Sequence, residues 1–402
     1  MKRKDFWKGF AVALALVLAA GVAWKPLCRI IPWQALPFQV ELSRGMKLSM
    51  IEGYLEDYYV EELDEQLIDD MLYTGMLAGA NDRYTYYLTE ETLEQYMENS
   101  NGEFDGIGIE VYQTQEGDVV IGSVLEGLPA EAAGFRKGDI IIGVDGEDVR
   151  GKMLSEVAMR IRGKAGTDVT IQVLREGAKE PLEFTVTRTD VVLRSVEGRM
   201  LEDGIGYMAI SGFKENTHAQ MMEDMGKLQE MGMKGLILDL RDNPGGLVRS
   251  VYQIGEEFLP EGTMVYTLDK EENRNDLKCD GEYSDIPLVV LVNENSASAS
   301  EIFAGAVKDM ERGKLVGTQT FGKGLVQRLF TLPDGSGINV TIQKYYTPKG
   351  TSIHGIGITP DEVVQLPEEY LSTALSAIPD GEDTQLQKGL EVLRGELGGY
   401  SY

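Results

Sequence analysis

Apolar residues recur every three or four positions in the first part of the chain, from about residue 41 onward. This spacing places them on one face of a helix, so it predicts a helical region over 41–102. The stretch 79–87 interrupts the pattern, and the sequence Asn-Ser-Asn-Gly at 99–102 ends it. The apolar positions that carry the pattern are Leu48, Ile51, Leu55, Leu67, Met71, Leu72 and Leu77.

Between residues 103 and 188 the pattern changes to short apolar segments separated by glycine turns. Segments of this kind favour β-strands, because apolar runs of a few residues bounded by turn formers suit a small sheet. The sequence therefore predicts a β-rich domain over 103–188. The predicted strands are 106–111, 118–124, 139–144, 168–174 and 184–187, and one helix is predicted at 155–161.

The region 189–365 alternates apolar strands with helical segments, which is the pattern of an α/β domain. A helical tail is predicted over 366–402. A chain of 402 residues has room for two or three domains that each bury a core. In the α/β region the predicted strands are 235–240 and 288–292, and the predicted helices are 216–231, 248–258 and 300–310.

The N-terminus has the pattern of a targeting segment. Four basic residues within the first eight precede an apolar run over 9–24. This run is long for a signal peptide and short for the roughly 20 residues of a membrane helix. The charge order places the rest of the chain outside the cytoplasm. Residues 1–40 are therefore predicted to be a signal peptide or membrane anchor with a linker, so that the protein is membrane-anchored or secreted.

Composition narrows the partners. The net charge is −28 and no basic cluster occurs beyond the first eight residues, so a nucleic acid is not an expected partner. The only cysteines, Cys28 and Cys279, cannot form a disulfide framework. Two histidines without a cysteine cluster make no zinc site, and no cofactor is expected. The sequence leaves open whether the chain forms a homo-oligomer.

The strongest local signal for chemistry is an apolar strand followed by small residues and the start of a helix, over 288–303. Ser298 then lies at a helix N-terminus, where free backbone amides and the helix dipole stabilise negative charge. A serine that attacks a carbonyl needs such a place, since its tetrahedral intermediate is an oxyanion. Ser298 and Glu301 also form a capping-box pattern, so a purely structural role stays open at this point.

A lysine between two glycines follows later in the chain. Lys323 has apolar neighbours, and a lysine can accept a serine proton only if burial lowers its pKa from about 10.4 towards 7–8. Residues 317–323 also fit the phosphate-binding spacing GxxxxGK, which would indicate an ATPase. Against this alternative, Gly324 stands where a Ser or Thr would hold magnesium.

The third signal is a buried strand that ends in a loop containing Pro244, Gly245 and Gly246. Backbone without side chains can present N–H groups to a reacting carbonyl oxygen, although an ordinary strand-to-helix turn explains the pattern as well. His218 and His354 lie at a predicted helix start and in a glycine-rich turn, and neither is expected to be a catalytic base.

These segments, in this order, resemble the carboxyl-terminal processing peptidase family, also called tail-specific proteases. Residues 127–141 resemble a PDZ domain, and the whole resemblance covers about 48–361. Asp82-Arg83-Tyr84 replaces the Asp-Pro-Tyr usual in the family, at no position that the resemblance assigns to catalysis. The matching core segments are 239–246, 296–301, 320–327, 332–336, 344–350 and 355–361.

The resemblance implies a serine nucleophile, a lysine general base, a glutamine that orients the lysine, and two backbone oxyanion donors. It also implies a crotonase-like spiral α/β peptidase core with an inserted PDZ-like domain. Four residues of extended strand span about 13 Å, so contact between the glutamine and the lysine requires a bend. By the resemblance, Ser298 is the nucleophile, Lys323 the general base and Gln327 the orienting glutamine. The oxyanion donors are the amides of Ala299 and of either Gly245 or Gly246.

In the PDZ-like domain the resemblance implies that a loop holds the terminal carboxylate of a peptide, which adds a strand to the sheet edge. Arg162 is the candidate for sensing the occupied domain, and a solvated surface arginine is its alternative. The loop residues are Gly106, Ile107, Gly108 and Ile109.

The leading interpretation is a serine endopeptidase that cleaves exported proteins near unstructured C-terminal tails. Its partners would be unfolded or tail-bearing proteins, and the membrane through the N-terminal segment. A non-catalytic PDZ adaptor on a peptidase fold is the alternative. The presence of both Ser298 and Lys323 disfavours it.

Overall fold

The computed structural model describes residues 43–114 and 116–398. The predicted signal peptide or membrane anchor and its linker, residues 1–40, lie outside the described residues. Within the described part of the chain, no helix combines the length and apolar character needed to cross a bilayer. The chain divides into two compact units between Gly79 and Ala80.

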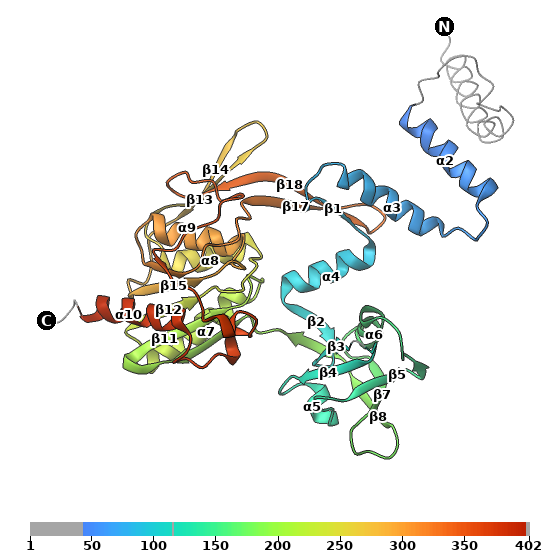
Figure 1. Cartoon of the computed structure of the whole chain (residues 1–402), viewed down its shortest axis with the longest axis horizontal. Helices are drawn as coiled ribbons and strands as arrows, with labels where there is room; N and C mark the ends of the chain where they lie inside the picture. The colour runs from blue at the N-terminus through green and yellow to red at the C-terminus, as the bar shows by residue number, and fades with distance from the viewer. Residues whose placement is uncertain (1–42, 115, 399–402) are drawn as a thin grey trace, which may run out of the picture. The chain divides into compact units, whose positions relative to one another are not determined.

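The first unit contributes two described helices, α2 (Arg44–Tyr58) and α3 (Glu65–Ala78) (Figure 1). Ser43 and Asp64 cap their starts, because each side chain accepts a backbone amide of the first turn. Neither helix contains a buried residue. The helices predicted in this region are confirmed, and so is the interruption that begins at Gly79.

The second unit is built on a six-stranded sheet in the order β10-β11-β12-β15-β16-β19. Only β10 runs antiparallel to its neighbour; the other neighbouring pairs are parallel. The α/β pattern predicted for this region is therefore confirmed. The strands are β10 (Val196–Met200), β11 (Ile205–Ile210), β12 (Gly235–Asp239), β15 (Leu288–Val292), β16 (Lys314–Gly317) and β19 (Glu362–Val363).

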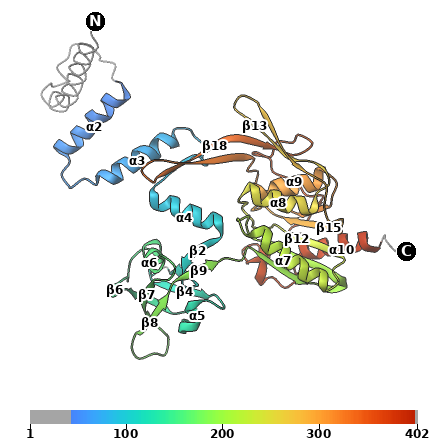
Figure 2. The ribbon, with the colours of Figure 1, turned by 180° about the vertical axis from the view of Figure 1, so that it is seen from behind.

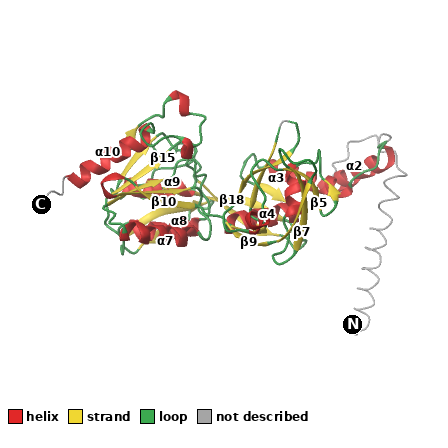
Figure 3. Cartoon of the chain, turned by 90° about the horizontal axis from the view of Figure 1, so that it is seen from below, coloured by secondary structure: helices red, strands yellow, loops and turns green. Residues whose placement is uncertain are grey.

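Both faces of this sheet are covered, which explains why its central strands are continuously apolar. In β15, Leu288, Val290 and Val292 point into one buried cluster, whereas Val289 and Leu291 point into another. Helix α10 packs on one face and helices α7 to α9 on the other (Figure 3). The helices are α7 (Thr217–Glu230), α8 (Val248–Phe258), α9 (Ala299–Asp309) and α10 (Thr384–Gly398), with short 3₁₀ turns at Glu202–Gly204, Glu368–Tyr370 and Leu375–Ala377.

A second sheet, which is antiparallel, was not predicted. Its order is β1-β18-β13-β14, and β17 pairs with β18 as well. In this sheet β1 pairs with β18. Strand β1 comes from the interruption between the predicted helices, and β18 lies near the end of the core. The strands are β1 (Tyr86–Leu88), β13 (Gly262–Asp269), β14 (Arg274–Cys279), β17 (Leu325–Thr331) and β18 (Gly337–Tyr346).

The β-rich domain lies between β1 and β10 in the chain, so it is an insertion. The chain enters it through α4 (Glu90–Asn101) and β2 (Glu103–Gly106), and leaves through β9 (Thr189–Val192), which pairs with β2 (Figure 2). Its own sheet has the order β3-β4-β5-β7-β8, with β6 on β5. The elements are β3 (Ile109–Gln113), β4 (Val119–Val124), α5 (Pro129–Ala133), β5 (Ile140–Val144), β6 (Glu147–Asp148), α6 (Leu154–Ile161), β7 (Asp168–Leu174) and β8 (Leu182–Thr187).

Helix α4 ends within the predicted break at 99–102: it continues to Asn101, and Gly102 ends it in the left-handed conformation with φ 75°. One predicted boundary in this region is wrong. The strand expected from residue 106 is split, because Gly108 has φ 85° and separates β2 from β3.

A buried ion network joins the end of β12 to the start of α10. The Arg241 guanidinium donates to Asp239 at 2.6 Å and to Asp383 at 2.8 Å, and the three side chains are at most 5% exposed. The Tyr207 hydroxyl also donates to Asp239, at 2.8 Å. Because buried carboxylates are costly without partners, this network fixes the strand end from which the glycine loop departs.

Arg241→Met leaves two buried carboxylates without their cation and should lower the free energy of unfolding by about 3–5 kcal/mol. Arg249→Met is the matched control, because the Arg249–Glu215 pair is exposed, and it should cost about 1 kcal/mol or less. Guanidinium unfolding followed by far-ultraviolet circular dichroism measures both. Circular dichroism is preferred to tryptophan fluorescence because all three tryptophans precede residue 43. Equal midpoints for the two variants would contradict this role of Arg241.

Candidate active site

Ser298 lies directly before α9, at the carboxyl end of the central strand β15. Its backbone has φ 55° and ψ −111°, a region that residues other than glycine rarely adopt. Such a conformation costs about 1–3 kcal/mol and persists only where the surroundings enforce it. The side chain is 8% exposed, so the hydroxyl sits at the edge of the buried core.

The neighbouring serines differ from Ser298 in their hydrogen bonds. The Ser296 hydroxyl donates to the carbonyl of Leu240 at 2.7 Å, and the Ser300 hydroxyl donates to the carbonyl of Asn243 at 2.9 Å. Both side chains are fully buried. The Ser298 hydroxyl donates to no such carbonyl within the part of the chain that the structure describes; its oxygen faces the Glu301 amide in the capping box at the start of α9. Of the three serines, it is the one whose hydroxyl is not tied to a backbone carbonyl.

The glycine loop after β12 packs directly against this serine. Gly245 has φ 103°, and a β-carbon there would lie 2.9 Å from Cβ of Ser298 and 2.7 Å from the carbonyl oxygen of Ala297. The fully buried Asn243 ties the two loops together, because its carbonyl accepts the amide of Ala297 at 3.0 Å. Only a glycine permits this approach.

The two glycine amides are not equivalent. The Gly245 amide donates to the side-chain oxygen of Asn243 at 2.9 Å. The Gly246 amide donates to no acceptor among the described residues, and neither does that of Ala299, the first residue of α9. The free amides of Gly246 and Ala299 are therefore the two that remain able to bind a ligand oxygen.

The fully buried Glu301 joins Ser298 to the lysine loop, which is the segment 318–324 between β16 and β17 that contains Lys323. One oxygen of its carboxylate accepts the amides of Ser298 and Lys323, both at 2.8 Å. The other oxygen accepts the amide of Gly322 at 2.7 Å and the hydroxyl of Thr320 at 2.6 Å. The capping pattern seen in the sequence is thus present, and the same side chain also fixes the segment between β16 and β17.

The half-buried Lys323 amine has a lowered pKa. Burial is the main cause, and the nearby Arg83 guanidinium lowers the pKa further. The carboxylates of Asp82 and Glu301 act in the opposite direction. The Lys323 Nζ atom lies 4.6 Å from the centre of the Tyr84 ring. The segment that contains Asp82 and Tyr84 therefore lies beside Lys323, which its sequence did not indicate.

The remaining sequence candidates lie as follows. The Gln327 amide donates to the Thr341 hydroxyl at 3.3 Å and not to Lys323, although a bulge bends the strand between Val326 and Gln327. His218 pairs with Glu257 at 2.9 Å. The phosphate-loop alternative is wrong in structure, because strand β17 follows Lys323 where a phosphate loop requires a helix.

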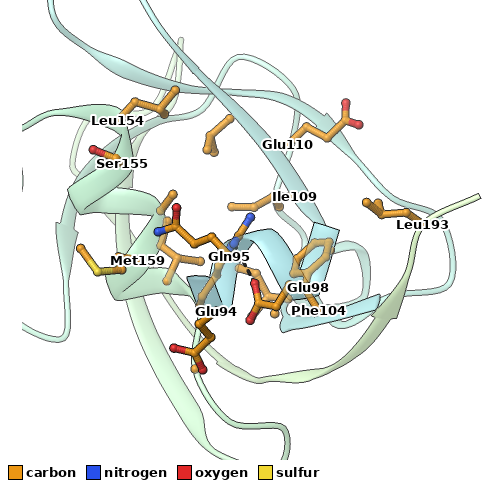
Figure 4. Close-up of a pocket in the computed structure, with 18 of the residues that line it drawn as sticks. Glu94, Gln95, Glu98, Phe104, Ile109, Glu110, Leu154, Ser155, Met159 and Leu193 are labelled. Atoms are coloured by element: carbon orange, nitrogen blue, oxygen red, sulfur yellow. Dashed lines mark hydrogen bonds and ion pairs between the residues drawn. The ribbon is translucent and has the colours of Figure 1, made fainter. Parts of the chain in front are cut away.

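A groove of about 660 Å³ lies in the PDZ-like domain between β3 and α6, and α4 adds residues to its lining. Figure 4 shows Gln95 and Glu98 of α4 close to Ile109 of β3. In the loop before β3, the carbonyls of Ile107 and Gly108 accept amides from within the domain. The amides of these two residues have no acceptor among the described residues.

Arg162 follows α6 and is not a free surface arginine. Its guanidinium pairs with Glu98 of α4 at 2.9 Å and lies 5.0 Å from the centre of the Phe104 ring. Burial raises the pKa of the Glu98 carboxyl, and Arg162 opposes that rise. Arg162 therefore links the groove to the helix through which the chain enters the domain.

The fold and the site are those of a serine peptidase with an inserted PDZ domain, and comparison with known proteins agrees. Residues 204–364 match peptidase family S41, and residues 106–186 match the PDZ domain. The carboxyl-terminal-processing protease of Synechocystis sp. is 40% identical over 326 residues, which cover 80% of this chain and 75% of that protein. The carboxy-terminal processing protease CtpB of Bacillus subtilis is 33% identical over 397 residues, covering 94% and 81%.

The chain therefore belongs to peptidase family S41 and is a serine peptidase of the carboxyl-terminal processing type. Among solved structures, an S41 protease from Bacteroides fragilis is 17% identical and superposes with a TM-score of 0.51 over 89% of this chain and 100% of that chain, which shows a shared fold. The family and the PDZ domain expected from the sequence are confirmed. The crotonase-like winding of the core stays a prediction.

Glu301→Gln should disrupt the site, because an amide group must turn its NH₂ toward two of the four donors. Buried donors without an acceptor cost about 1–3 kcal/mol each. We expect peptidase activity to fall about 100-fold or more, since misplacement of reacting groups by about 1 Å has that effect. Glu294→Gln is the control, because the exposed Glu294 accepts one bond, from Thr318 at 2.8 Å. Similar activity in both variants would show that Glu301 does not organise the site.

Proposed function

We propose that the protein hydrolyses peptide bonds near the C-terminal tails of exported proteins, with Ser298 as nucleophile and Lys323 as general base. One observation carries the proposal: the backbone amides of both residues bind the same oxygen of Glu301. The two residues are thereby held beside each other. The burial that lowers the Lys323 pKa supports the role of base, since only a neutral amine accepts a proton.

The reaction follows from these positions. The neutral Lys323 amine takes the proton of the Ser298 hydroxyl as its oxygen attacks the substrate carbonyl. The resulting ammonium gives that proton to the leaving amine, which releases the C-terminal product and leaves an acyl-enzyme. Lys323 then takes a proton from the water that attacks the ester and gives it to the Ser298 oxygen as the N-terminal product leaves.

For the oxyanion we propose the amides of Ala299 and Gly246. The alternative, Gly245, is disfavoured because its amide already donates to Asn243. Two free amides near the nucleophile form the donor pair that acyl transfer needs, each worth about 10²–10³ in rate. Gln327 is proposed to orient Lys323, which requires its amide to leave Thr341.

The PDZ domain is proposed to bind the substrate's terminal carboxylate. The free amides of Ile107 and Gly108 lie at the start of β3, where an added peptide strand would pair. Arg162 is proposed to transmit occupancy, since it connects the groove to α4 through Glu98. A peptide bound in the groove would contact both elements.

The protein is proposed to act outside the cytoplasm, attached through residues 1–40 or released after their cleavage. The motivation is the basic and apolar order of those residues. Fractionation of the producing cells, with protease added to intact cells, distinguishes the membrane-bound from the released form. Recovery of the chain only in a protease-protected cytoplasmic fraction would refute export.

Ser298→Ala and Lys323→Ala should each reduce cleavage of casein to below about 10⁻³ of the wild-type rate, because the two residues act as a unit. Circular dichroism should remain native for both. Lys314→Ala, which removes an exposed lysine at the start of β16, is the control and should retain activity. Substantial turnover by either the Ser298→Ala or the Lys323→Ala variant would refute the proposed Ser298–Lys323 dyad.

Activity should rise with pH through the lowered pKa of Lys323, because deprotonation creates the base. The rise should occur below the usual lysine range of about 10.4. A double variant, His218→Gln with His354→Gln, should keep the same profile of kcat/KM against pH. If the double variant loses the rise, a histidine is the base.

Matched peptides with free-acid and amidated C-termini test tail recognition. Backbone amides of the PDZ loop bind a carboxylate more strongly than a neutral amide group. The free-acid peptide should therefore be cleaved faster than the amidated one at low peptide concentration. Arg162→Ala should lower kcat more than it raises KM if it transmits occupancy. Equal rates for the two peptides on the wild type would discard tail recognition. Faster, unselective cleavage by a variant lacking 103–188 would make the domain an inhibitory lid.

A further inference from the structure

The segment Asp82–Thr85 is fixed to the sheet that borders the lysine loop. The Asn339 side chain in β18 donates to the carbonyl of Tyr84 at 3.0 Å, and the amide of Thr341 donates to the hydroxyl of Thr85 at 3.1 Å. Within the segment, Asp82 accepts the amide of Tyr84 at 3.0 Å and the hydroxyl of Thr85 at 2.7 Å. The segment is therefore a rigid feature and not a loose connection.

Two cationic side chains lie against the single ring of Tyr84. The Lys323 Nζ atom is 4.6 Å from the ring centre, and the Arg83 guanidinium carbon is 5.0 Å from it. The same guanidinium is 5.5 Å from the centre of the Phe321 ring. Arg83 forms no ion pair with any described residue, so no contacting carboxylate neutralises its charge.

These contacts act on Lys323 in two ways. The ring restricts where the amine can lie and attracts it when charged. The two cationic groups are within about 10 Å of each other, comparable to the Debye length at physiological ionic strength, so their repulsion is only partly screened. The carboxylates that face the lysine are Asp82 and Glu301, and both favour the charged amine. Arg83 is thus the charged neighbour that opposes them.

We propose that Arg83 and Tyr84 form a positioning element of the active site, in which the Tyr84 ring holds the Lys323 side chain and Arg83 disfavours its protonation. This inference rests on the proposed function, because it takes Lys323 as the general base. Burial is the larger effect, and Arg83 adds to it against the two carboxylates that favour the protonated amine. Arg83 extends the working range of the peptidase to lower pH.

Arg83→Gln should move the acidic limb of kcat/KM against pH to higher pH by a few tenths of a unit, since it removes an exposed, partly screened charge. At a given pH on the acidic limb, kcat/KM should therefore be roughly two- to threefold lower than in the wild type. The high-pH plateau should stay at the wild-type value. Raising the salt concentration to about 1 M should shrink the difference, because the Debye length falls to about 3 Å. Arg83→Lys keeps the charge and should restore the wild-type limb.

Arg328→Gln is the matched control. Arg328 is likewise an exposed arginine stacked on an aromatic ring, 5.0 Å from the centre of Phe330, in strand β17. It changes the net charge by the same amount but is not among the charged neighbours of Lys323. Its limb should coincide with that of the wild type.

The holding role of Tyr84 is tested at the high-pH plateau, where Lys323 is neutral in every variant. Tyr84→Phe keeps the ring and should keep kcat, whereas Tyr84→Leu should lower kcat about tenfold with little change in KM. Equal plateau values for Tyr84→Leu and the wild type would overturn the holding role.

The outcomes separate this inference from the proposed function. If Lys323→Ala is inactive but the limbs of Arg83→Gln and Arg328→Gln both coincide with that of the wild type, the role of Arg83 fails and the dyad stands. An active Lys323→Ala removes the dyad and the inference together. A shifted limb in Arg83→Gln with an unchanged one in Arg328→Gln supports the charge effect.

Discussion

The Glu301 carboxylate accepts four hydrogen bonds in a fully buried position, and the arrangement of the site depends on it. A buried carboxylate is costly unless its oxygens are satisfied. Here the donors come from the Ser298 segment and from the lysine loop, so satisfying the charge brings the two together. Glu301 also lies in the first turn of α9, where the helix dipole favours a negative charge. A network of this kind is rigid when complete and fails when one member is lost.

The strain at Ser298 is understandable in this setting. Its φ of 55° is held from one side by the bond to Glu301 and from the other by the approach of Gly245. The loop that contains Gly245 is in turn fixed through Asn243 and, at the strand end before it, by the buried guanidinium of Arg241. The strained conformation persists because the surrounding backbone is over-determined.

The protonation of Lys323 is set by a balance between burial and neighbouring charges. Loss of water disfavours the ammonium form, while the carboxylates of Asp82 and Glu301 favour it. The proposed contribution of Arg83 lies in this balance. The proposed base needs no histidine, since burial lowers the pKa of Lys323 towards the range in which an amine can accept a proton.

Much of the core could be predicted, because its central strands are buried on both faces and their apolar residues are continuous. Helix α8 and strand β15 have the predicted ends, 248–258 and 288–292. Strands β17 and β18 were missed because their residues are mostly only partly buried and show no clear alternation. Pairing of β18 with β1 joins segments far apart in the chain, which local patterns do not reveal.

The residues of the candidate site could be named from the sequence, but the hydrogen bonds that connect them could not. Ser298 and Glu301 were recognised as a capping pattern, and the sequence could not show that the same carboxylate also binds the lysine loop. The choice between Gly245 and Gly246 depends on which amide Asn243 occupies, and that is a property of the folded loop. The place of Tyr84 beside Lys323 depends on the β1–β18 pairing in the same way.

The central claim is that Ser298, alone among its neighbouring serines, is activated by the lysine held beside it. Mass spectrometry of the protein after reaction with a fluorophosphonate serine probe tests this directly, because it locates the modified residue. The account predicts modification of Ser298, absent from Ser296 and Ser300 and lost when Lys323 is replaced by alanine. Modification of another serine, or undiminished modification of Ser298 without the lysine, would contradict the account.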